Sequence, residues 1–444
     1  MKDTIKRREF IKQAAASSMG VGLMATGAPF IHYNGSANEK LVVAIMGVNS
    51  RGSALAKGFA KLPGAEVAYI CDVEDVAMAN GMVAVEEGGQ KKKPKSEKDI
   101  RKVLEDSSID ALVIAAPDHW HAPAAMMALN AGKHVYVEKP CSQNPHEGEM
   151  LVEAAQKHQK VVQMGNQRRS WPHVQEAIQE IKDGAIGKPY FARAWYANIR
   201  GSIGHGKPAP VPAGLDFDLW QGPVPRRPYQ DNLIHYNWHW FWHWGTGEIL
   251  NNGTHVLDLC RWGLGVDYPI RVSSGGGRYA FDDDWETPDT QTAYYDFANG
   301  MTVSWEGRSC NGREIEGVSA GCAFHGTGGS LAIQGNGYTL YDNTNTEIKS
   351  VTQSKANATD LTGPGLDLDQ YHLEAFREAI RSGKESPTYI ADANKSVQMC
   401  HLGNIAYRTK RVLECDPKTG RILGDDEAMK LWGREYEPGW EPVV

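Results

Sequence analysis

Two glycines near the start of the chain bound a turn that could bind a pyrophosphate. Residues 41–46 form an uninterrupted apolar run, Gly47 follows directly, and Gly52 opens a segment of helical composition. A tight glycine turn lets the backbone approach a pyrophosphate, whose charge is stabilised at the N-terminus of the following helix. The usual fingerprint has a third glycine in the middle, where this chain has asparagine. We expect five residues of the turn to contact a dinucleotide: Gly47, Asn49, Ser50, Arg51 and Gly52.

An aspartate at the end of the next predicted strand would bind the adenosine ribose of that dinucleotide. Asp72 follows the strand-like residues 66–71 and lies 20 residues after Gly52. A carboxylate in this place accepts hydrogen bonds from ribose hydroxyls. Its charge would repel a 2′-phosphate, which favours NAD as the cofactor. Because Arg51 is close enough in sequence to pair with such a phosphate, NADP stays open as the alternative.

A lysine follows another predicted strand of the same region. The apolar residues 135–137 precede Glu138, Lys139 and Pro140. Ligands of parallel sheets bind at the carboxyl ends of the strands, which is where Lys139 would lie. This position favours a role for Lys139 in chemistry over that of a solvated surface charge.

The elements that must position these residues alternate between strands and helices. Strand-like runs at 41–46, 66–71, 111–115, 135–137 and 161–164 are separated by helical segments. This alternation predicts a doubly wound parallel sheet, and therefore a Rossmann domain over residues 38–166.

The pattern changes in the second part of the chain. Helices are predicted at 171–183, 369–382 and 392–412, and strands at 191–196, 290–297, 301–308, 317–325 and 330–333, mostly joined by turns rich in Gly or Asn. This predicts an α+β domain over residues 167–444 with a large, mainly antiparallel sheet and helices on one face. The fold class expected for the whole chain is α/β. Residues 201–237, rich in Pro and Gly, should form an ordered loop at the site.

An aromatic run ahead of residue 248 has the most unusual composition in the chain. Residues 237–248 contain four tryptophans that alternate with His and Phe. We expect an extended segment with its indoles on one face, either as a floor for a carbohydrate or as an aromatic core between domains. His239 and His243 are four apart, but the segment lacks the Glu of zinc-binding helices, so no metal site is expected. The substrate residues expected are Trp240, Trp242, His243, Tyr196 and Arg168.

Charge and cysteine content exclude other classes of protein. The formal net charge of −7 argues against a nucleic-acid partner, because phosphate binding needs a basic face. The seven cysteines are odd in number and have no close pair at metal-ligand spacing, so they are not a disulfide framework.

The N-terminus resembles a twin-arginine export signal. Arg7 and Arg8 are followed by Phe10, Ile11 and Lys12, and then by a small and apolar stretch at 14–28. A basic start and a short apolar run indicate a removable signal over residues 1–37, so the mature protein should have no membrane span and should be periplasmic. The alternative is the basic start of an amphipathic helix. Export in the folded state would suit a protein that loads its cofactor in the cytoplasm.

From residue 40 onward, the chain resembles the Gfo/Idh/MocA family of oxidoreductases. The resemblance rests on the glycine turn and on residues 116–121, 132–140 and 251–258, of which Glu138-Lys139-Pro140 is the most specific segment. In this family the lysine reaches the nicotinamide ribose and the reacting hydroxyl. The resemblance implies further residues that line the cofactor: Pro117, Trp120, His121, Glu138 and Asn166.

The family also pairs this lysine with an Asp-x-x-x-His segment. His255 matches the histidine, whereas position 251 is Asn. Positions four apart lie on the same side of a helix. Asn251 cannot take up a proton but can hold a sugar hydroxyl, so we expect His255 to be the general base, with Lys139 as its relay or electrostatic partner.

These expectations combine into an exported dehydrogenase for sugars or glycosides with tightly held NAD(P). The exported relatives it resembles are similar to glucose-fructose oxidoreductase and glucoside 3-dehydrogenase. One alternative is an NAD-dependent glycosidase that acts by transient oxidation, although such relatives lack the lysine that this chain keeps at Lys139. The other is a non-catalytic sugar-binding protein. The family resemblance further implies a homodimer or homotetramer.

Overall fold

A computed structural model describes residues 40–352 and 366–444 of the chain. The predicted export signal therefore lies outside the described residues. Within these residues, no helix is both long and apolar enough to cross a membrane.

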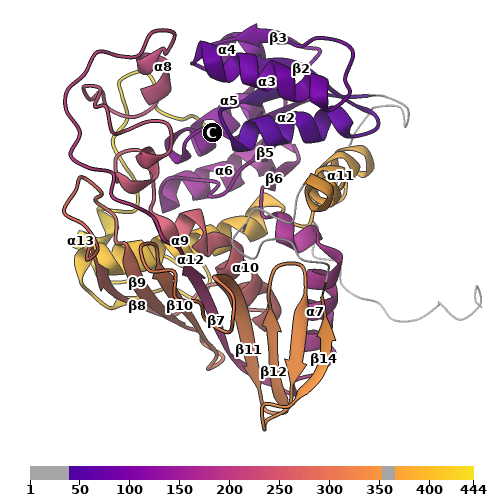
Figure 1. The fold of residues 1–444 in the computed structure, drawn as a ribbon, viewed down its shortest axis with the longest axis vertical. Helices are drawn as coiled ribbons and strands as arrows, with labels where there is room; N and C mark the ends of the chain where they lie inside the picture. Colours follow the sequence, from indigo (N-terminus) through magenta and orange to yellow (C-terminus); the bar gives the residue numbers. More distant parts are fainter. Residues whose placement is uncertain (1–39, 353–365) are drawn as a thin grey trace, which may run out of the picture.

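The N-terminal part, drawn in indigo to purple at the top of Figure 1, folds around a parallel sheet. This sheet has six strands in the order β3-β2-β1-β4-β5-β6. Its central strands are apolar on both faces, as expected for strands that helices cover on both sides. The prediction of a Rossmann domain is therefore confirmed. The strands are β1 (Leu41–Met46), β2 (Ala65–Cys71), β3 (Lys95–Glu97), β4 (Ala111–Ile114), β5 (His134–Val137) and β6 (Val162–Met164).

Helices cover both faces of this sheet, and the strand order reverses between β1 and β4. Such a reversal opens a crevice at the carboxyl ends of the strands, where ligands of doubly wound sheets bind. The hydrophobic core on one face draws on α2 (Arg51–Lys61) and α3 (Asp75–Glu87). The core on the other face draws on α4 (Ile100–Leu104), α5 (Asp118–Asn130) and α6 (Pro145–His158).

The second part contains a sheet of nine strands in the order β14-β13-β12-β11-β7-β10-β9-β8-β15. Strands β7 and β10 pair in parallel, and every other neighbouring pair in this order is antiparallel. The predicted mainly antiparallel sheet is therefore confirmed. The strands are β7 (Pro189–Ala197), β8 (Arg271–Gly277), β9 (Thr290–Asp296), β10 (Thr302–Arg308), β11 (Ala320–Gly326), β12 (Gly329–Ile333), β13 (Tyr338–Tyr341), β14 (Glu347–Val351) and β15 (Leu413–Glu414).

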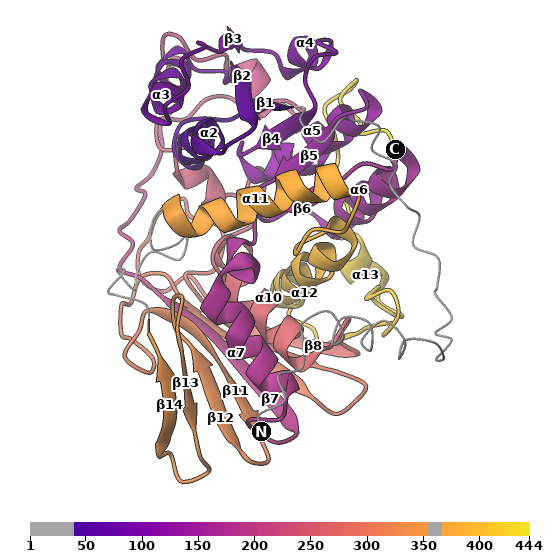
Figure 2. The same ribbon diagram turned by 90° about the vertical axis from the view of Figure 1, so that its right-hand side faces the viewer.

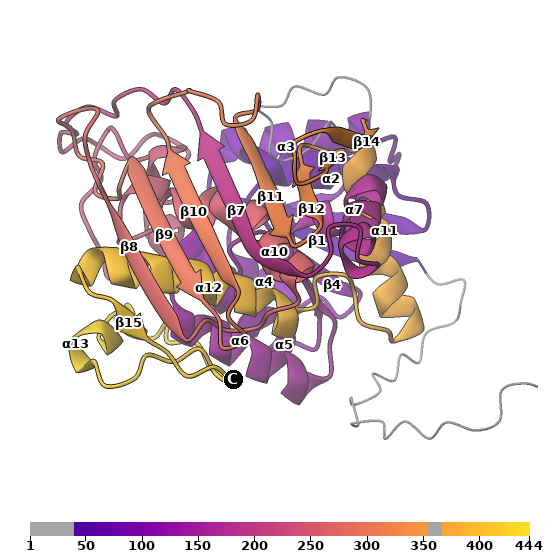
Figure 3. The ribbon, with the colours of Figure 1, turned by 90° about the horizontal axis from the view of Figure 1, so that it is seen from below.

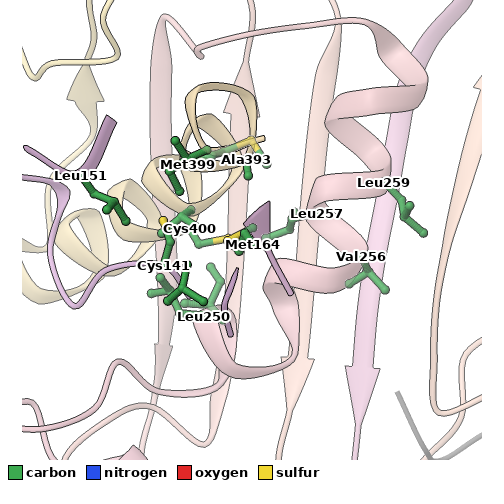
Figure 4. Packing of buried hydrophobic residues seen from close by; sticks show 14 of the residues in the cluster. Cys141, Leu151, Met164, Leu250, Val256, Leu257, Leu259, Ala393, Met399 and Cys400 are labelled. Carbon is green, nitrogen blue, oxygen red and sulfur yellow. The ribbon is translucent and has the colours of Figure 1, made fainter. Parts of the chain in front are cut away.

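Three helices pack on one face of the large sheet, as Figure 3 shows from below. They are α7 (Pro172–Lys182), α10 (Gly253–Leu264) and α12 (Ile390–Thr409). Leu257 of α10 and Cys400 of α12 share one apolar cluster with Met164 of β6 and Leu151 of α6 (Figure 4). The two parts of the molecule are thus joined by a continuous core.

Helix α11 (Leu366–Ser382) belongs to the second part by sequence but packs on the first (Figure 2). The Phe376 ring lies edge-on to Phe59 and Tyr136, with centroids 6.3 and 5.8 Å apart. The predicted boundary at residues 166 and 167 therefore does not separate two independent cores, because the Rossmann sheet needs α11 to cover one of its faces.

Candidate active site

A cavity of about 450 Å³ lies at the carboxyl ends of the parallel strands. One wall comes from the turns that follow β1, β2, β4 and β5, and the opposite wall from residues after β7 and from the loop that precedes α9 (Glu248–Asn251). The cavity thus lies at the switch point of the Rossmann sheet, where a dinucleotide binds in this fold.

The glycine turn has the geometry that close approach to a ligand requires. Gly47 has a φ of +79°, and a Cβ atom on it would lie 2.7 Å from backbone atoms of Ala116. A Cβ on Gly52 would collide with the carbonyl oxygen of Gly47. Asn49, Ser50 and Arg51 line the cavity between the two glycines, where α2 begins. No larger side chain fits at either glycine.

Asp72 also lines the cavity, directly after β2. Its two carboxylate oxygens accept hydrogen bonds from the backbone of Val48 at 2.7 Å and of Glu74 at 3.0 Å. Burial raises the pKa of Asp72, and these two hydrogen bonds oppose that shift. The carboxylate is therefore fixed in orientation and keeps lone pairs that a ribose diol could use.

The guanidinium group of Arg51 is directed at carboxylates on the other side of the turn. Its Nε lies 2.8 Å from Glu138 Oε1, and its Nη1 lies 2.5 Å from Asp369 Oδ2 on α11. Two buried ion pairs of this kind hold the side chain in one place. They leave Arg51 poorly placed to receive a phosphate beside Asp72.

The residues expected to line the cofactor fall into two groups. Pro117, Trp120, His121 and Glu138 line the cavity. Asn166 follows β6, is 1% exposed and does not line the cavity, and neither atom of its amide has a hydrogen-bond partner among the described residues. A buried amide without partners is costly, so a ligand or water that satisfied it would be stabilising.

Lys139 projects into the cavity from the end of β5. Its Nζ donates to the backbone oxygen of Asn251 at 2.7 Å and to Asn251 Oδ1 at 3.0 Å. Burial lowers the pKa of Lys139, whereas Glu138 and Asp118 favour its charged form. The structure thus joins Lys139 to Asn251, the position of the aspartate in the family's Asp-x-x-x-His segment.

The segment that carries Asn251 and His255 is not one continuous helix. Asn251 ends α9, and His255 lies in α10 after a break at Asn252. His255 is 2% exposed and does not line the cavity, and neither of its ring nitrogens has a partner within residues 40–352 and 366–444. Burial and the nearby Lys139 cation hold the pKa of His255 well below its ordinary value. Its role as general base stays a prediction.

Two polar residues that the sequence did not single out, Asn198 and Arg200, join Tyr196 in the far wall of the cavity, with Glu248 and Ser309 behind them. Arg200 Nε lies 2.9 Å from Glu248 Oε2, and Glu248 also accepts from Ser309 Oγ at 3.0 Å. The hydroxyl of Tyr196 accepts hydrogen bonds from Asn198 at 2.5 Å and from Arg200 at 3.2 Å. This wall offers the mixed donors and acceptors that sugar hydroxyls bind. The sequence did contain a signal for these two residues, because Asn198 and Arg200 lie just after the predicted strand that contains Tyr196.

The aromatic run differs from its prediction. Asn237–Trp240 is a short 3₁₀ helix, η2, followed by turns, so the expected extended segment is wrong. Trp240 is 1% exposed and stacks on Trp285 with centroids 3.9 Å apart, because the turns direct this indole towards Trp285 and not along a face shared with the other indoles of the run. Four of the five expected substrate residues do not line the cavity: Trp240, Trp242, His243 and Arg168.

Tyr196 is the fifth expected substrate residue and does line the cavity. Among the displaced residues, Trp242 lies under Arg408 at 4.7 Å, and a ring nitrogen of His243 lies 2.8 Å from the backbone oxygen of Pro225. Arg168 is buried with its guanidinium 5.4 Å from the ring of Trp171. These side chains therefore serve packing around the cavity.

The Pro- and Gly-rich loop covers the Asp72 end of the cavity, as expected for an ordered loop at the site. Gly214 accepts hydrogen bonds from Lys98 Nζ at 2.9 Å and from the backbone of Asp75 at 3.2 Å. The backbone of Asp216 donates to Val73 at 2.9 Å. Leu215, next in the chain, lines the cavity, as does Trp220 of α8 (Phe217–Gln221). We call residues 212–221 the cover loop.

Both parts of the chain match one family. A profile described as an oxidoreductase family with an NAD-binding Rossmann fold matches residues 19–166, and one described as the C-terminal alpha/beta domain of that family matches residues 191–441. Because the second match alone spans more than half of the chain, the chain belongs to the Gfo/Idh/MocA family of oxidoreductases.

Curated relatives align with part of the chain. A glycosyl hydrolase family 109 protein of Saccharopolyspora erythraea is 27% identical in an alignment of 255 residues that covers 48% of this chain and 55% of that protein. An alpha-N-acetylgalactosaminidase of Shewanella oneidensis is 27% identical in an alignment of 213 residues that covers 43% of this chain and 46% of that protein. The chain thus spans about half the length of the curated relatives it matches.

Solved structures align over more of the chain. Levoglucosan dehydrogenase in complex with NADH has a TM-score of 0.66 at 19% identity, covering 85% of this chain and 99% of that one. Aldose-aldose oxidoreductase from Caulobacter crescentus has a TM-score of 0.63 at 19% identity, covering 85% and 100%. At these identities, the likeness shows a shared fold.

Proposed function

We propose that the protein is an NAD-dependent dehydrogenase that oxidises or reduces a hydroxyl carbon of a sugar or glycoside. The observation that carries this proposal is the position of Lys139, between the glycine turn of the Rossmann sheet and the polar wall of the second part. A small hydroxylated substrate bound at that wall would meet the ammonium group of Lys139 and the reactive end of a dinucleotide together.

The residues present fit a dinucleotide. Gly47 and Gly52 leave room at the backbone, and Asp72 offers an ordered carboxylate. When bound, the nicotinamide would accept or supply the hydride, which no side chain can do. The protein would contribute binding, orientation and the movement of one proton.

NAD fits this site better than NADP. The carboxylate of Asp72 would repel a 2′-phosphate, and Arg51 is held by Glu138 and Asp369 instead of being available to neutralise one. The cover loop supports tight retention, because its hydrogen bonds to Val73, Asp75 and Lys98 close the adenosine side.

Different side chains of the protein would stabilise charge on the substrate and bind its hydroxyls. The Lys139 cation, held by Asn251, would stabilise negative charge that develops on the reacting oxygen. Arg200 and Asn198 would bind neighbouring hydroxyls, and the pairing of Arg200 with Glu248 leaves this wall close to neutral. A near-neutral wall favours uncharged sugars over acidic ones.

A glycosidase that acts by transient oxidation is the second candidate. It is favoured by the curated relatives, which include an alpha-N-acetylgalactosaminidase and glycosyl hydrolase family 109 proteins. Such an enzyme would use the same oxidation at Lys139 but would end with the dinucleotide unchanged and the glycosidic bond cleaved.

One experiment separates the two candidates. The protein as purified would be incubated with D-glucose, methyl β-D-glucopyranoside, levoglucosan and p-nitrophenyl α-N-acetylgalactosaminide. A dehydrogenase should produce reduced nicotinamide together with a keto sugar or, from the anomeric carbon of D-glucose, a lactone, whereas a glycosidase should release p-nitrophenol without net reduction. Retention of NAD with neither reaction on any of these compounds would support the third alternative, a non-catalytic sugar-binding protein.

We also propose that the protein is exported by the twin-arginine route to the periplasm and assembles into a homodimer or homotetramer. The support is the Arg7–Arg8 segment and the face of the nine-stranded sheet opposite α7, α10 and α12, where Tyr294 is 50% exposed. Replacing both arginines by lysine should keep the precursor in the cytoplasm, and light scattering should give a mass of two or four chains. Export of that variant, or a monomeric mass, would contradict the respective proposal.

A further inference from the structure

We propose that His239 is the group that takes the proton from the substrate hydroxyl, with its Nε2 facing the cavity. This inference rests on the dehydrogenase function proposed above. It assigns proton acceptance to a residue of the aromatic run. The family's Asp-x-x-x-His segment and the predicted pair of Lys139 and His255 both assign this role to other residues.

The hydrogen bond of the His239 ring fixes which of its nitrogens can accept a proton. Nδ1 lies 2.7 Å from the backbone oxygen of Tyr236, and a carbonyl oxygen can only accept. Nδ1 therefore carries the hydrogen, and Nε2 is left with its lone pair. The ring is further held by Trp238, stacked at a centroid distance of 3.6 Å, and by Tyr236 at 4.4 Å. A preoriented acceptor is what proton transfer requires.

His239 belongs to the same group of contacts as Lys139. Lys139 Nζ donates to Asn251, and Asn251 Nδ2 donates to the hydroxyl of Tyr236 at 3.4 Å. Tyr236 in turn holds the His239 ring through its backbone oxygen. Lys139, Tyr236, His239 and Asn251 all line the cavity. A hydroxyl beside Lys139 would thus lie near a fixed imidazole.

The other histidines are less suited to accept a proton from the substrate. Within residues 40–352 and 366–444, the remaining histidines that line the cavity are His121 and His235. The two ring nitrogens of His121 lie 2.6 and 2.7 Å from the backbone oxygens of Pro140 and Ala116. His235 Nε2 lies 3.5 Å from Glu74, next to Asp72 and thus away from Lys139. His255 is 2% exposed and does not line the cavity.

The surroundings of His239 keep its ring neutral. Burial lowers its pKa well below the ordinary value, and the cations of Lys139 and Arg200 and the ring of His121 lower it further. A neutral imidazole has the free lone pair that a base needs, whereas an imidazolium has none. The same cations would favour the developing alkoxide of the substrate.

The step balances as an alcohol oxidation. The O–H bond of the substrate breaks and its proton moves to His239 Nε2, while the C–H bond breaks and its electron pair leaves as hydride to the oxidised dinucleotide. A C=O bond forms, and the substrate loses two electrons and two hydrogens. The imidazolium returns its proton to solvent before the next turnover.

The first test measures the ring itself and needs no turnover. Diethyl pyrocarbonate reacts with accessible, unprotonated imidazoles, and peptide mass spectrometry locates the product. On the holoprotein we expect His239 to be modified and protected by methyl β-D-glucopyranoside, with the half-exposed His146 as a positive control and His255 unmodified. Modification of His255 with sparing of His239 would overturn the proposal.

The second test separates proton transfer from packing. His239→Asn keeps a donor near the Tyr236 oxygen but lacks Nε2, and we expect kcat to fall roughly 100- to 10,000-fold with unchanged dinucleotide content. In His239→Gly, added imidazole should restore activity, whereas His255→Gly should show no such rescue. His173→Asn on α7, far from the cavity, should match the wild type.

The outcomes distinguish this proposal from the function on which it rests. If His239→Asn retains kcat within about threefold, or if imidazole rescues only His255→Gly, His239 is not the proton acceptor. If the wild type holds NAD but oxidises none of the named sugars, the proposed function fails, while the labelling test still shows whether His239 presents an unprotonated ring.

Discussion

The ammonium group of Lys139 lies in the cavity between the glycine turn and the polar wall of the second part, where it donates twice to Asn251. Lys139→Met keeps the length of the side chain and removes its charge. We expect kcat to fall roughly 100- to 10,000-fold while the dinucleotide stays bound. Rapid-mixing absorbance of the nicotinamide would measure the rate, and Lys139→Arg should recover part of it. A Lys139→Met rate within about threefold of wild type would remove Lys139 from the chemistry.

A second prediction concerns the effect of Asp72 on the preference for NAD over NADP. Asp72→Ser removes the charge beside the expected ribose, while Arg51 remains held by Glu138 and Asp369. We expect the ratio of the Kd for NADP to that for NAD to drop by at least about tenfold, equivalent to roughly 1.4 kcal/mol. Titration of the stripped protein with each dinucleotide would test this. An unchanged ratio would show that Asp72 does not face the ribose.

The sequence predicts a site residue when that residue directly follows a recognisable strand. Gly47, Asp72 and Lys139 each follow an apolar strand, so the fold class alone places them at one edge of the sheet. Arg200 and His239 could not be placed in this way, because they come from separate stretches that meet only after the second sheet has folded. A local sequence pattern does not predict contacts between stretches that are distant in the chain.

At the level of elements, the cover loop should control how fast the dinucleotide leaves. Lys98 Nζ donates to Gly214 at 2.9 Å and pairs with Asp75 at 2.8 Å. Lys98→Met removes both contacts, so we expect dissociation of bound NAD to accelerate by roughly 3- to 10-fold with little effect on the chemical step. A chase with excess unlabelled NAD would measure the rate. Lys95→Met on β3, whose amine contacts Tyr69 and Asp106, is the matched control.

A cover loop that does not restrain the cofactor would give a different result. Dissociation rates that match among wild type, Lys98→Met and Lys95→Met would show that the loop leaves the adenosine side open. Retention of the dinucleotide would then depend on the contacts of the glycine turn and Asp72 alone.

The aromatic run permits a stability prediction. Trp240 is 1% exposed and stacks on Trp285, whereas Trp242 is only partly buried. We expect Trp240→Ala to lower the free energy of unfolding by roughly 3–5 kcal/mol, and Trp242→Ala by about 1 kcal/mol. Urea denaturation would measure both. Loss of substrate binding in Trp240→Ala without loss of stability would restore the carbohydrate floor that the sequence suggested.

The elements that sequence reasoning missed share a cause. Strand β8 ends in three glycines and β15 has only two residues, so neither shows an apolar alternation. The aromatic run shows such an alternation but folds into η2 and turns, in which Trp240 stacks on Trp285 and Trp238 stacks on His239. In both cases tertiary packing, and not the local sequence pattern, determines the secondary structure.

At the scale of the whole molecule, buried neutral histidines should make the fold sensitive to acid. Burial lowers the pKa of His134 and His401 to about 3 and that of His372 to about 4. The unfolded chain binds these protons near pH 6.5, so stability is fully present above that pH and decreases as the pH falls towards 4. Each histidine should contribute up to roughly 1.4 kcal/mol per pH unit.

Urea unfolding between pH 7 and pH 4.5 would test this prediction. The denaturation midpoint should fall steadily, and His401→Gln, which keeps a polar group near the backbone oxygen of Ser142, should flatten the decrease. A midpoint independent of pH over this range would show that these rings are not kept neutral by burial.

The two-part architecture was predictable, because the change from alternating strands and helices to clustered strands is visible in the sequence. The return of α11 to the Rossmann sheet was not, since its apolar positions specify a buried face but not which sheet they meet. Phe376 packs against Phe59 across more than 300 residues of chain, and this contact makes the two parts one folding unit.

The most direct test of the central claim is to identify what the protein holds when it is purified without added cofactor. The protein would be denatured, and NAD(H) and NADP(H) in the supernatant quantified by mass spectrometry. If the proposed site is right, the protein should release close to one NAD(H) per chain and little NADP(H), because Asp72 would face the ribose and the cover loop would lie over it. A protein that releases no dinucleotide, and that also fails to bind either one when titrated, would contradict the dinucleotide site and every role assigned to Lys139 and His239.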